Sequence, residues 1–106
     1  MTDIQLLYVT CASVEQAQAI GQSLVKDKLA ACVNILPAMQ SIYEWEGTGE
    51  QANEVVMIVK TTADGAQACQ EAILSRHEYD CPCILQIPVS AGHPAFLDWI
   101  KTQCER

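Results

Sequence analysis

The sequence predicts an α+β domain of the ferredoxin-like type, the split βαβ sandwich in which two helices cover one face of a four-stranded antiparallel sheet. Two observations lead to this fold class. Segments with strand and helix periodicity follow one another in the order βαββαβ, and the two central strands form a long β-hairpin. One more helical segment follows the last strand, so we expect an added C-terminal helix. No linker interrupts the chain, and residues 1–106 are expected to form a single domain.

The first strand and the first helix are predicted from their periodicity. Residues 4–11 are apolar on both faces, which indicates a buried strand. Ser13 and Gln16 form a capping-box pattern, which opens a helix that we expect to end near Lys28. The apolar residues expected on its buried face are Val14, Ala17, Ile20, Leu24 and Val25.

The stretch 29–64 predicts the hairpin of two long strands. An apolar, β-branched run at residues 55–59 marks the second strand, and Gly47 and Gly49 supply residues that tolerate positive φ in the turn. Pro37 cannot donate a ladder hydrogen bond, so we expect it at an edge or a bulge of the first strand.

The tip of this hairpin outreaches a small sheet and carries aromatic side chains. Tyr43 and Trp45 lie at period-two spacing, hence on one face of the strand. In a monomer they would leave aromatic surface and a strand edge in water, and a second subunit would cover both. Packing between subunits is therefore favoured over ligand stacking for these two rings.

The remaining elements follow the hairpin. Asp64 is expected to cap a second helix that ends near Arg76, and a polar loop at 77–82 leads into a last strand at 83–89. A third helix should begin near Pro94. The residues expected to face the interior are Ala66, Cys69, Ile73 and Leu74 in the second helix and Phe96, Leu97, Ile100 and Cys104 in the third, while Cys83, Leu85, Ile87 and Val89 share one face of the last strand.

Composition narrows the functional classes. The formal net charge is -7, so neither nucleic acid nor an anionic membrane is an expected partner. No segment approaches the roughly 18 consecutive apolar residues of a transmembrane helix. No Lys or Arg precedes Lys26, which argues against a signal peptide, and a cytoplasmic protein is expected.

The cysteine pattern favours free thiols. No two of the 6 cysteines have C-x-x-C spacing, which argues against structural zinc sites and iron-sulfur clusters. Cys32, Cys69 and Cys104 have apolar neighbours, so we expect thiols packed as small hydrophobic groups. Cys81 and Cys83 flank a proline and would share a face on a strand; packed thiols are again the favoured interpretation.

Several motifs occur in a fixed order and together resemble one family. They are A-A-C-V-N-I-L-P at 30–37, S-I-Y-E-W-E-G at 41–47, V-K-T at 59–61, H-E-Y-D-C-P at 77–82, I-P-V at 87–89 and F-L-D-W-I at 96–100. This set resembles the divalent-cation-tolerance family, CutA. The resemblance implies a cytoplasmic ferredoxin-like homotrimer, similar in architecture to the PII signalling proteins, with a link to copper binding and to tolerance of divalent cations. It implies no catalysed reaction and no organic cofactor.

The resemblance also implies where the functional residues lie. The positions that match the family's pattern and that would line the clefts between subunits are Tyr43, Trp45, Glu54, Lys60, Tyr79 and Pro82. Glu54 and Lys60 are six residues apart on one strand, so they share a face but do not pair within a subunit.

A metal site at Cys11 and His77 is a further implication of the resemblance. A thiolate with an imidazole suits Cu(I) or Zn²⁺ better than Mg²⁺ or Ca²⁺, with water, Glu78 or Asp80 completing the site. From the fold class we expect Cys11 and His77 at opposite edges of the sheet, so that two subunits would be needed. His77 follows a helix, where capping of the helix end is an equal alternative. The chain departs from the family pattern at Arg76, where some members have His, and at Glu78, where Pro is common.

Three functional classes follow from these observations. The first is a trimeric protein that binds copper or a similar metal ion and takes part in the response to that ion. The second is a PII-like interaction module that holds a small anionic ligand near Lys60 and Arg76, the basic side chains expected close to the clefts. An enzyme ranks last, because the sequence shows no nucleophile with a base and no phosphate-binding glycine loop, although Glu78 and Asp80 lie close in sequence.

Overall fold

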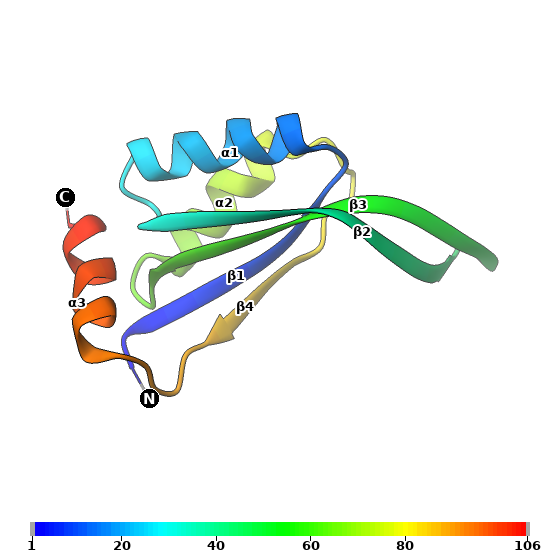
Figure 1. The fold of residues 1–106 in the computed structure, drawn as a ribbon. Helices are drawn as coiled ribbons and strands as arrows, with labels where there is room; N and C mark the ends of the chain where they lie inside the picture. Colours follow the sequence, from blue (N-terminus) through cyan, green and yellow to red (C-terminus); the bar gives the residue numbers. More distant parts are fainter. Residues whose placement is uncertain (1, 106) are drawn as a thin grey trace.

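The computed structural model describes residues 2–105, and its elements follow one another in the predicted order (Figure 1). The bounds are β1 Ile4–Cys11, α1 Val14–Lys26, β2 Cys32–Trp45, β3 Thr48–Thr62, α2 Ala66–Arg76, β4 Ile84–Pro88 and α3 Pro94–Gln103. The first strand has the bounds that its sequence predicts, whereas β4 is shorter than the expected strand at 83–89.

The strands form one antiparallel sheet in the order β2-β3-β1-β4. Helices α1 and α2 lie on one face of this sheet, and α3 lies at one end, beside the chain termini (Figure 1). The ferredoxin-like fold class, with its long hairpin and added C-terminal helix, is therefore confirmed.

Alternation along the central strands places the core between the sheet and helices α1 and α2. Leu7 and Val9 of β1 and Met57 and Val59 of β3 are buried in one cluster with apolar residues of both helices. The residues that the helices contribute include Ala17, Ile20, Leu24, Ala66, Cys69 and Ile73, as predicted. A smaller cluster of Ile4, Ala31 and Ile100 fixes α3.

Three expected core residues are exposed instead. Val25 and Leu74 each follow a buried residue by one position, and each step along a helix turns the side chain by about 100°, away from the sheet. Phe96 is also exposed, and the amino group of Lys60 lies 5.2 Å from the centre of its ring. These three assignments were wrong because helical spacing alone does not fix the width of the buried stripe.

Helix α1 begins as predicted but ends earlier. The Ser13 hydroxyl accepts a hydrogen bond from the Gln16 backbone N–H at 3.1 Å, and the Gln16 side chain accepts one from Ala12 N–H instead of closing the capping box on Ser13. Lys28 is not helical: its φ is 60°, and its N–H donates to the carbonyl of Val25. The helix thus ends in a Schellman motif with a lysine at the left-handed position where glycine is usual.

The hairpin turn contains one of the two glycines expected there. Trp45 pairs with Thr48, so the loop has two residues, Glu46 and Gly47, both with positive φ. Gly49 is part of β3 and was wrongly expected in the turn. The prediction for Pro37 is confirmed, because β2 is an edge strand and its register with β3 shifts between Leu36 and Met39.

The other two helices start differently from each other. Asp64 does not cap α2; the N-cap is Gly65, whose N–H donates to the Thr62 hydroxyl at 3.1 Å. Helix α3 begins with Pro94 in its first turn, as predicted, after an exposed His93.

The helix-free face of the sheet carries exposed apolar side chains. Leu85 and Ile87 lie on one face of β4, as expected, but both side chains are exposed. Ile42, which is 81% exposed, and Trp45, which is 55% exposed, lie on opposite faces of the projecting hairpin. Figure 1 shows β2 and β3 extending beyond the rest of the sheet. Four of the functional residues implied by the resemblance, Tyr43, Trp45, Glu54 and Tyr79, gather at the end from which the hairpin projects.

Candidate functional site

A cleft of about 450 Å³ lies where the hairpin leaves the sheet, and we call it the hairpin cleft. It opens between the hairpin, the end of β1 and the loop that follows α2. Its lining residues are Thr10, Tyr43, Trp45, Ala52, Glu54, Tyr79, Asp80, Cys81 and Cys83. Four of the predicted cleft residues, Tyr43, Trp45, Glu54 and Tyr79, are therefore placed in one cavity.

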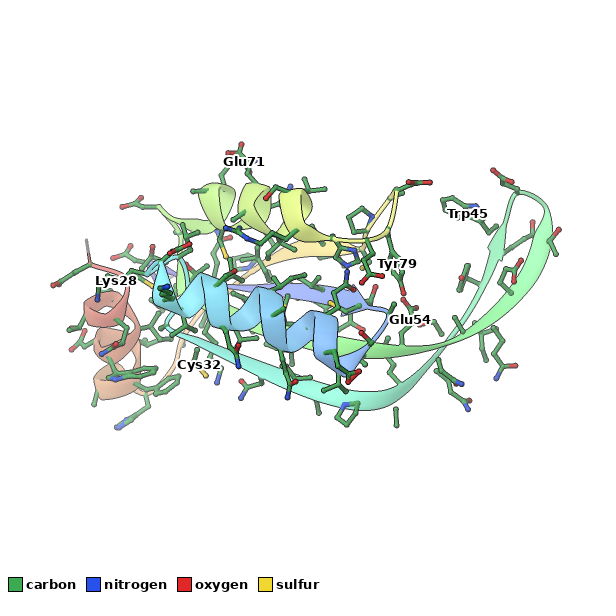
Figure 2. The ribbon with its side chains drawn as sticks, turned by 90° about the horizontal axis from the view of Figure 1, so that it is seen from above. Lys28, Cys32, Trp45, Glu54, Glu71 and Tyr79 are labelled. Carbon is green, nitrogen blue, oxygen red and sulfur yellow. The ribbon has the colours of Figure 1, made fainter. Side chains whose placement is uncertain are left out.

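Tyr79 and Glu54 connect the loop to the hairpin. The Tyr79 hydroxyl donates a hydrogen bond to Glu54 Oε2 at 2.9 Å, and Figure 2 shows the two side chains next to each other below Trp45. Burial, followed by the hydrogen bond to the Glu54 carboxylate and its charge, raises the pKa of Tyr79 to about 12. The phenol stays protonated at neutral pH and holds the carboxylate in the cleft.

Thr10 at the end of β1 holds both ends of the loop. Its carbonyl oxygen lies 2.7 Å from His77 Nε2, and its N–H donates to the carbonyl of Cys83 at 3.3 Å. The expectation that Cys11 and His77 lie at opposite edges of the sheet is therefore wrong. Strand β3 is antiparallel to β1 and α2 reverses the direction again, so α2 ends beside the end of β1.

His77 uses both ring nitrogens in hydrogen bonds. Its Nε2 faces the Thr10 carbonyl, so this nitrogen carries the proton and donates. Its Nδ1 accepts from the Tyr79 N–H at 3.1 Å, and the two rings lie 4.8 Å apart. In this arrangement the imidazole orders the loop and has no free lone pair for a metal ion.

Cys11 is fully buried in the main core cluster. Burial, followed by the charges of Glu54 and Glu78, raises its pKa to about 11, so the thiol is protonated at neutral pH. Cys11 has no exposed surface, and both ring nitrogens of His77 are in hydrogen bonds, so this pair does not fit a metal ion in this arrangement. Among residues 2–105, no three His, Cys, Asp or Glu side chains are grouped so that they could hold one.

The basic residues expected near the cleft lie elsewhere. Lys60 is at the opposite end of β3, roughly 20 Å from Glu54 at about 3.3 Å per strand residue, and contacts Phe96 of α3. Arg76 is exposed and lies 3.9 Å from Asp27. Neither residue, nor Pro82, lines the hairpin cleft. Within the described residues, the charged groups of the lining are the carboxylates of Glu54 and Asp80.

Cys81 and Cys83 are the part of the site that the sequence reading missed. Packed thiols were expected, but both residues are exposed and both line the cleft. Burial and the charge of Glu54 raise the pKa of Cys83 above its ordinary value of 9.0. The C-x-C spacing was the available signal, since residues two apart in extended chain share a side. The prediction of free thiols is confirmed for Cys11, Cys32, Cys81, Cys83 and Cys104.

No helix of residues 2–105 is both long enough and apolar enough to cross a bilayer.

Comparison with known proteins gives one consistent family. The family described as "CutA1 divalent ion tolerance protein" matches residues 5–103. The divalent-cation tolerance protein CutA of Archaeoglobus fulgidus is 42% identical over 99 residues, which are 93% of this chain and 96% of that protein. The chloroplastic protein CutA of Arabidopsis thaliana is 38% identical over 96 residues, 91% of this chain; the chain spans only 53% of that longer relative.

Solved structures agree with this result. CutA from Xylella fastidiosa superposes with a TM-score of 0.95 at 35% identity, covering 98% of this chain and 100% of that one. The Archaeoglobus fulgidus structure, which is described as a periplasmic divalent cation tolerance protein, superposes with a TM-score of 0.93 at 41% identity, covering 96% of this chain and 99% of that one.

Proposed function

The chain belongs to the CutA1 divalent ion tolerance family, and we propose that it acts as a cytoplasmic homotrimer that binds a metal cation, with copper as the expected metal. The observation that carries this proposal is the lining of the hairpin cleft. Glu54 and Asp80 supply carboxylates and Cys81 and Cys83 supply thiols, and no Lys or Arg of residues 2–105 is among the lining residues. Such a cavity attracts cations and offers them both hard and soft donors.

Exposed apolar surface supports the trimer. Ile42, Trp45, Leu85 and Ile87 are exposed on the hairpin and on β4. Single exposed apolar residues are ordinary, but Ile42 and Trp45 lie on opposite faces of a projecting hairpin with a free β2 edge, where subunits can pair. A neighbouring subunit placed there would also close the hairpin cleft and contribute the donors that one subunit lacks.

The state of the cysteines supports a reducing compartment. Cys81 and Cys83 are exposed free thiols, which suits the cytoplasm better than an oxidising environment. The proposal includes no catalysed reaction.

The alternative of a small anionic ligand has less support. An anion needs a cationic or N–H-rich pocket, whereas Lys60 and Arg76 lie outside the cleft and its charged lining residues are acidic. The hairpin cleft therefore favours the cation.

Native mass spectrometry of the reduced protein tests the proposal. Oxygen-free titration with Zn²⁺ and with Cu(I) should give a complex of three chains that takes up metal. The double variant Glu54→Gln with Asp80→Asn should lose most of the Zn²⁺ uptake, because it removes both carboxylates of the cleft. Glu71→Gln is the matched control, since Glu71 is exposed on α2, away from the cleft (Figure 2). A monomer, or a trimer that binds neither ion, would contradict the proposal.

A further inference from the structure

We infer that Cys81 and Cys83 form a two-thiolate site for a soft monovalent cation of the Cu(I) type in the hairpin cleft. The inference rests on the proposed function, because it names the ligands and the charge of the cation that the cleft takes up. It moves the metal away from Cys11 and His77, the pair that the family resemblance implies.

Exposure separates these two thiols from the other four. Cys11 and Cys69 are buried, and Cys32 and Cys104 are half-buried. Cys81 and Cys83 are exposed, and both line the same cavity of about 450 Å³. A cation that enters the cleft therefore meets two thiols without any opening of the core.

Pro82 and Thr10 fix the segment that carries the two thiols. Proline locks its own φ near -65° and restricts the preceding residue to extended conformations. Cys81 lies in a bend and Cys83 just before β4, and both residues line the hairpin cleft. The Thr10 N–H holds the Cys83 carbonyl at 3.3 Å, so the segment is tied to the end of β1. Little conformational entropy remains to be lost when both sulfurs bind one ion.

Coordination number selects the cation. A structural Zn²⁺ site needs four donors, more than two thiols supply, so Zn²⁺ would also need the carboxylates of Glu54 and Asp80. Cu(I) is soft and accepts two thiolates as a complete, nearly linear set. The two-thiol arrangement therefore fits a monovalent soft ion without further protein ligands.

The charges around the thiols make binding depend on pH. Glu54 on β3 and Asp80 in the loop line the cleft together with Tyr43 and with Tyr79, whose pKa is raised to about 12. The carboxylates disfavour free thiolates and favour a cation in the same place. Binding replaces two S–H bonds by two S–Cu bonds and releases two protons, so affinity should rise with pH.

The test is a competition titration of the reduced, full-length protein with Cu(I) against a chromophoric Cu(I) chelator, under argon. Wild type should bind one Cu(I) per chain with an ultraviolet thiolate-to-copper absorption band. Cys81→Ser and Cys83→Ser should each weaken binding by at least about 100-fold, which is about 2.7 kcal/mol. Cys32→Ser is the matched control and should bind within about twofold of wild type, because Cys32 lies outside the cleft.

The outcomes distinguish this inference from the proposed function. Unchanged Cu(I) affinity and absorption in the Cys81→Ser, Cys83→Ser double variant would overturn the inference, while Zn²⁺ uptake that depends on Glu54 would leave the proposed function standing. Absence of any metal binding by wild type would overturn both. Circular dichroism checks folding, and both exposed positions should accept serine. If the double variant does not fold, the two single variants and blocking of the surface thiols by iodoacetamide give the same comparison.

Discussion

At the scale of single residues, the hydrogen bond from Tyr79 to Glu54 holds the loop against the hairpin. Replacing Tyr79 by Phe removes one donor to a charged acceptor that is half-buried. We expect Tyr79→Phe to lower the free energy of unfolding by about 1 to 2 kcal/mol, measured by urea denaturation at fixed protein concentration. Tyr43→Phe is the control, because the Tyr43 hydroxyl lines the same cleft but makes no hydrogen bond to the described residues. Equal stability losses in both variants would contradict the assigned role of Tyr79.

A second residue-scale prediction concerns Cys11 and alkaline pH. The pKa of this thiol is raised from 9.0 to about 11 in the folded protein, so the folded state holds a proton that the unfolded state releases. Its contribution to stability is complete below pH 9 and is lost as the pH rises to about 11. This contribution is at most about 3 kcal/mol.

Cys11→Ala provides the comparison for this pH dependence. The variant lacks the titrating thiol, so its unfolding free energy should fall less steeply between pH 9 and 11 than that of wild type, whatever its stability at pH 7. Parallel pH profiles for the two proteins would show that Cys11 does not titrate in this range.

At the scale of the elements, the hairpin turn depends on one of its two neighbouring glycines. Gly47 has a φ of 82°, whereas Gly49 lies in β3, and a Cβ at either position would meet no atom within 4 Å. Gly47→Ala should therefore destabilise the protein by about 1 kcal/mol through backbone strain, and Gly49→Ala should change the unfolding free energy by less than about 0.5 kcal/mol or raise it. Thermal unfolding of the pair measures both. A larger loss for Gly49→Ala would contradict the turn.

At the end of α1, a substitution to glycine should stabilise the protein. Lys28 occupies the left-handed position of the Schellman motif with a φ of 60°. Lys28→Gly should raise the unfolding free energy by about 0.5 to 1 kcal/mol, because glycine adopts this conformation without the Cβ penalty. Lys26→Gly, inside the helix, should lower it by a similar amount and serves as the control. Destabilisation by Lys28→Gly would show that the lysine side chain contributes there.

Periodicity predicted most of the elements because the core is built from it. The buried residues of β1, β3, α1 and α2 are those whose spacing matches a strand or a helix. The predicted ends of the helices and strands were less accurate. Lys28 and Glu46 adopt positive φ although neither is glycine, and Asp64 stands next to the true N-cap. At Lys28 and Glu46 the geometry of the helix end and of the two-residue turn sets the positive φ, against the preference of the residue type.

At the scale of the whole molecule, the resemblance placed four cleft residues correctly but could not place the charges around them. Lys60 shares a face with Glu54, yet strand length keeps the two roughly 20 Å apart, and Arg76 faces Asp27. Cys81 and Cys83 line the cleft because the loop folds back onto the end of β1. Such loop paths depend on long-range contacts, so sequence periodicity does not reveal them.

The proposed trimer leads to a prediction about Trp45, which is 55% exposed on the hairpin. Trp45→Asp should weaken association, lower the melting temperature and make it depend on protein concentration, because dissociation becomes coupled to unfolding. Sedimentation velocity measures the mass, and Trp45→Phe should retain the wild-type mass as the conservative control. A Trp45→Asp variant with unchanged mass and melting temperature would contradict a subunit contact at this residue.

The most direct measurement of the central claim, that the cleft of a trimer binds a metal cation, is anomalous diffraction from reduced crystals soaked with copper without oxygen. We predict one anomalous peak per chain inside the hairpin cleft, next to Cys81 and Cys83 and on the side of Glu54. A peak at Cys11 and His77, or crystals of a trimer that show no copper in any cleft, would contradict this account.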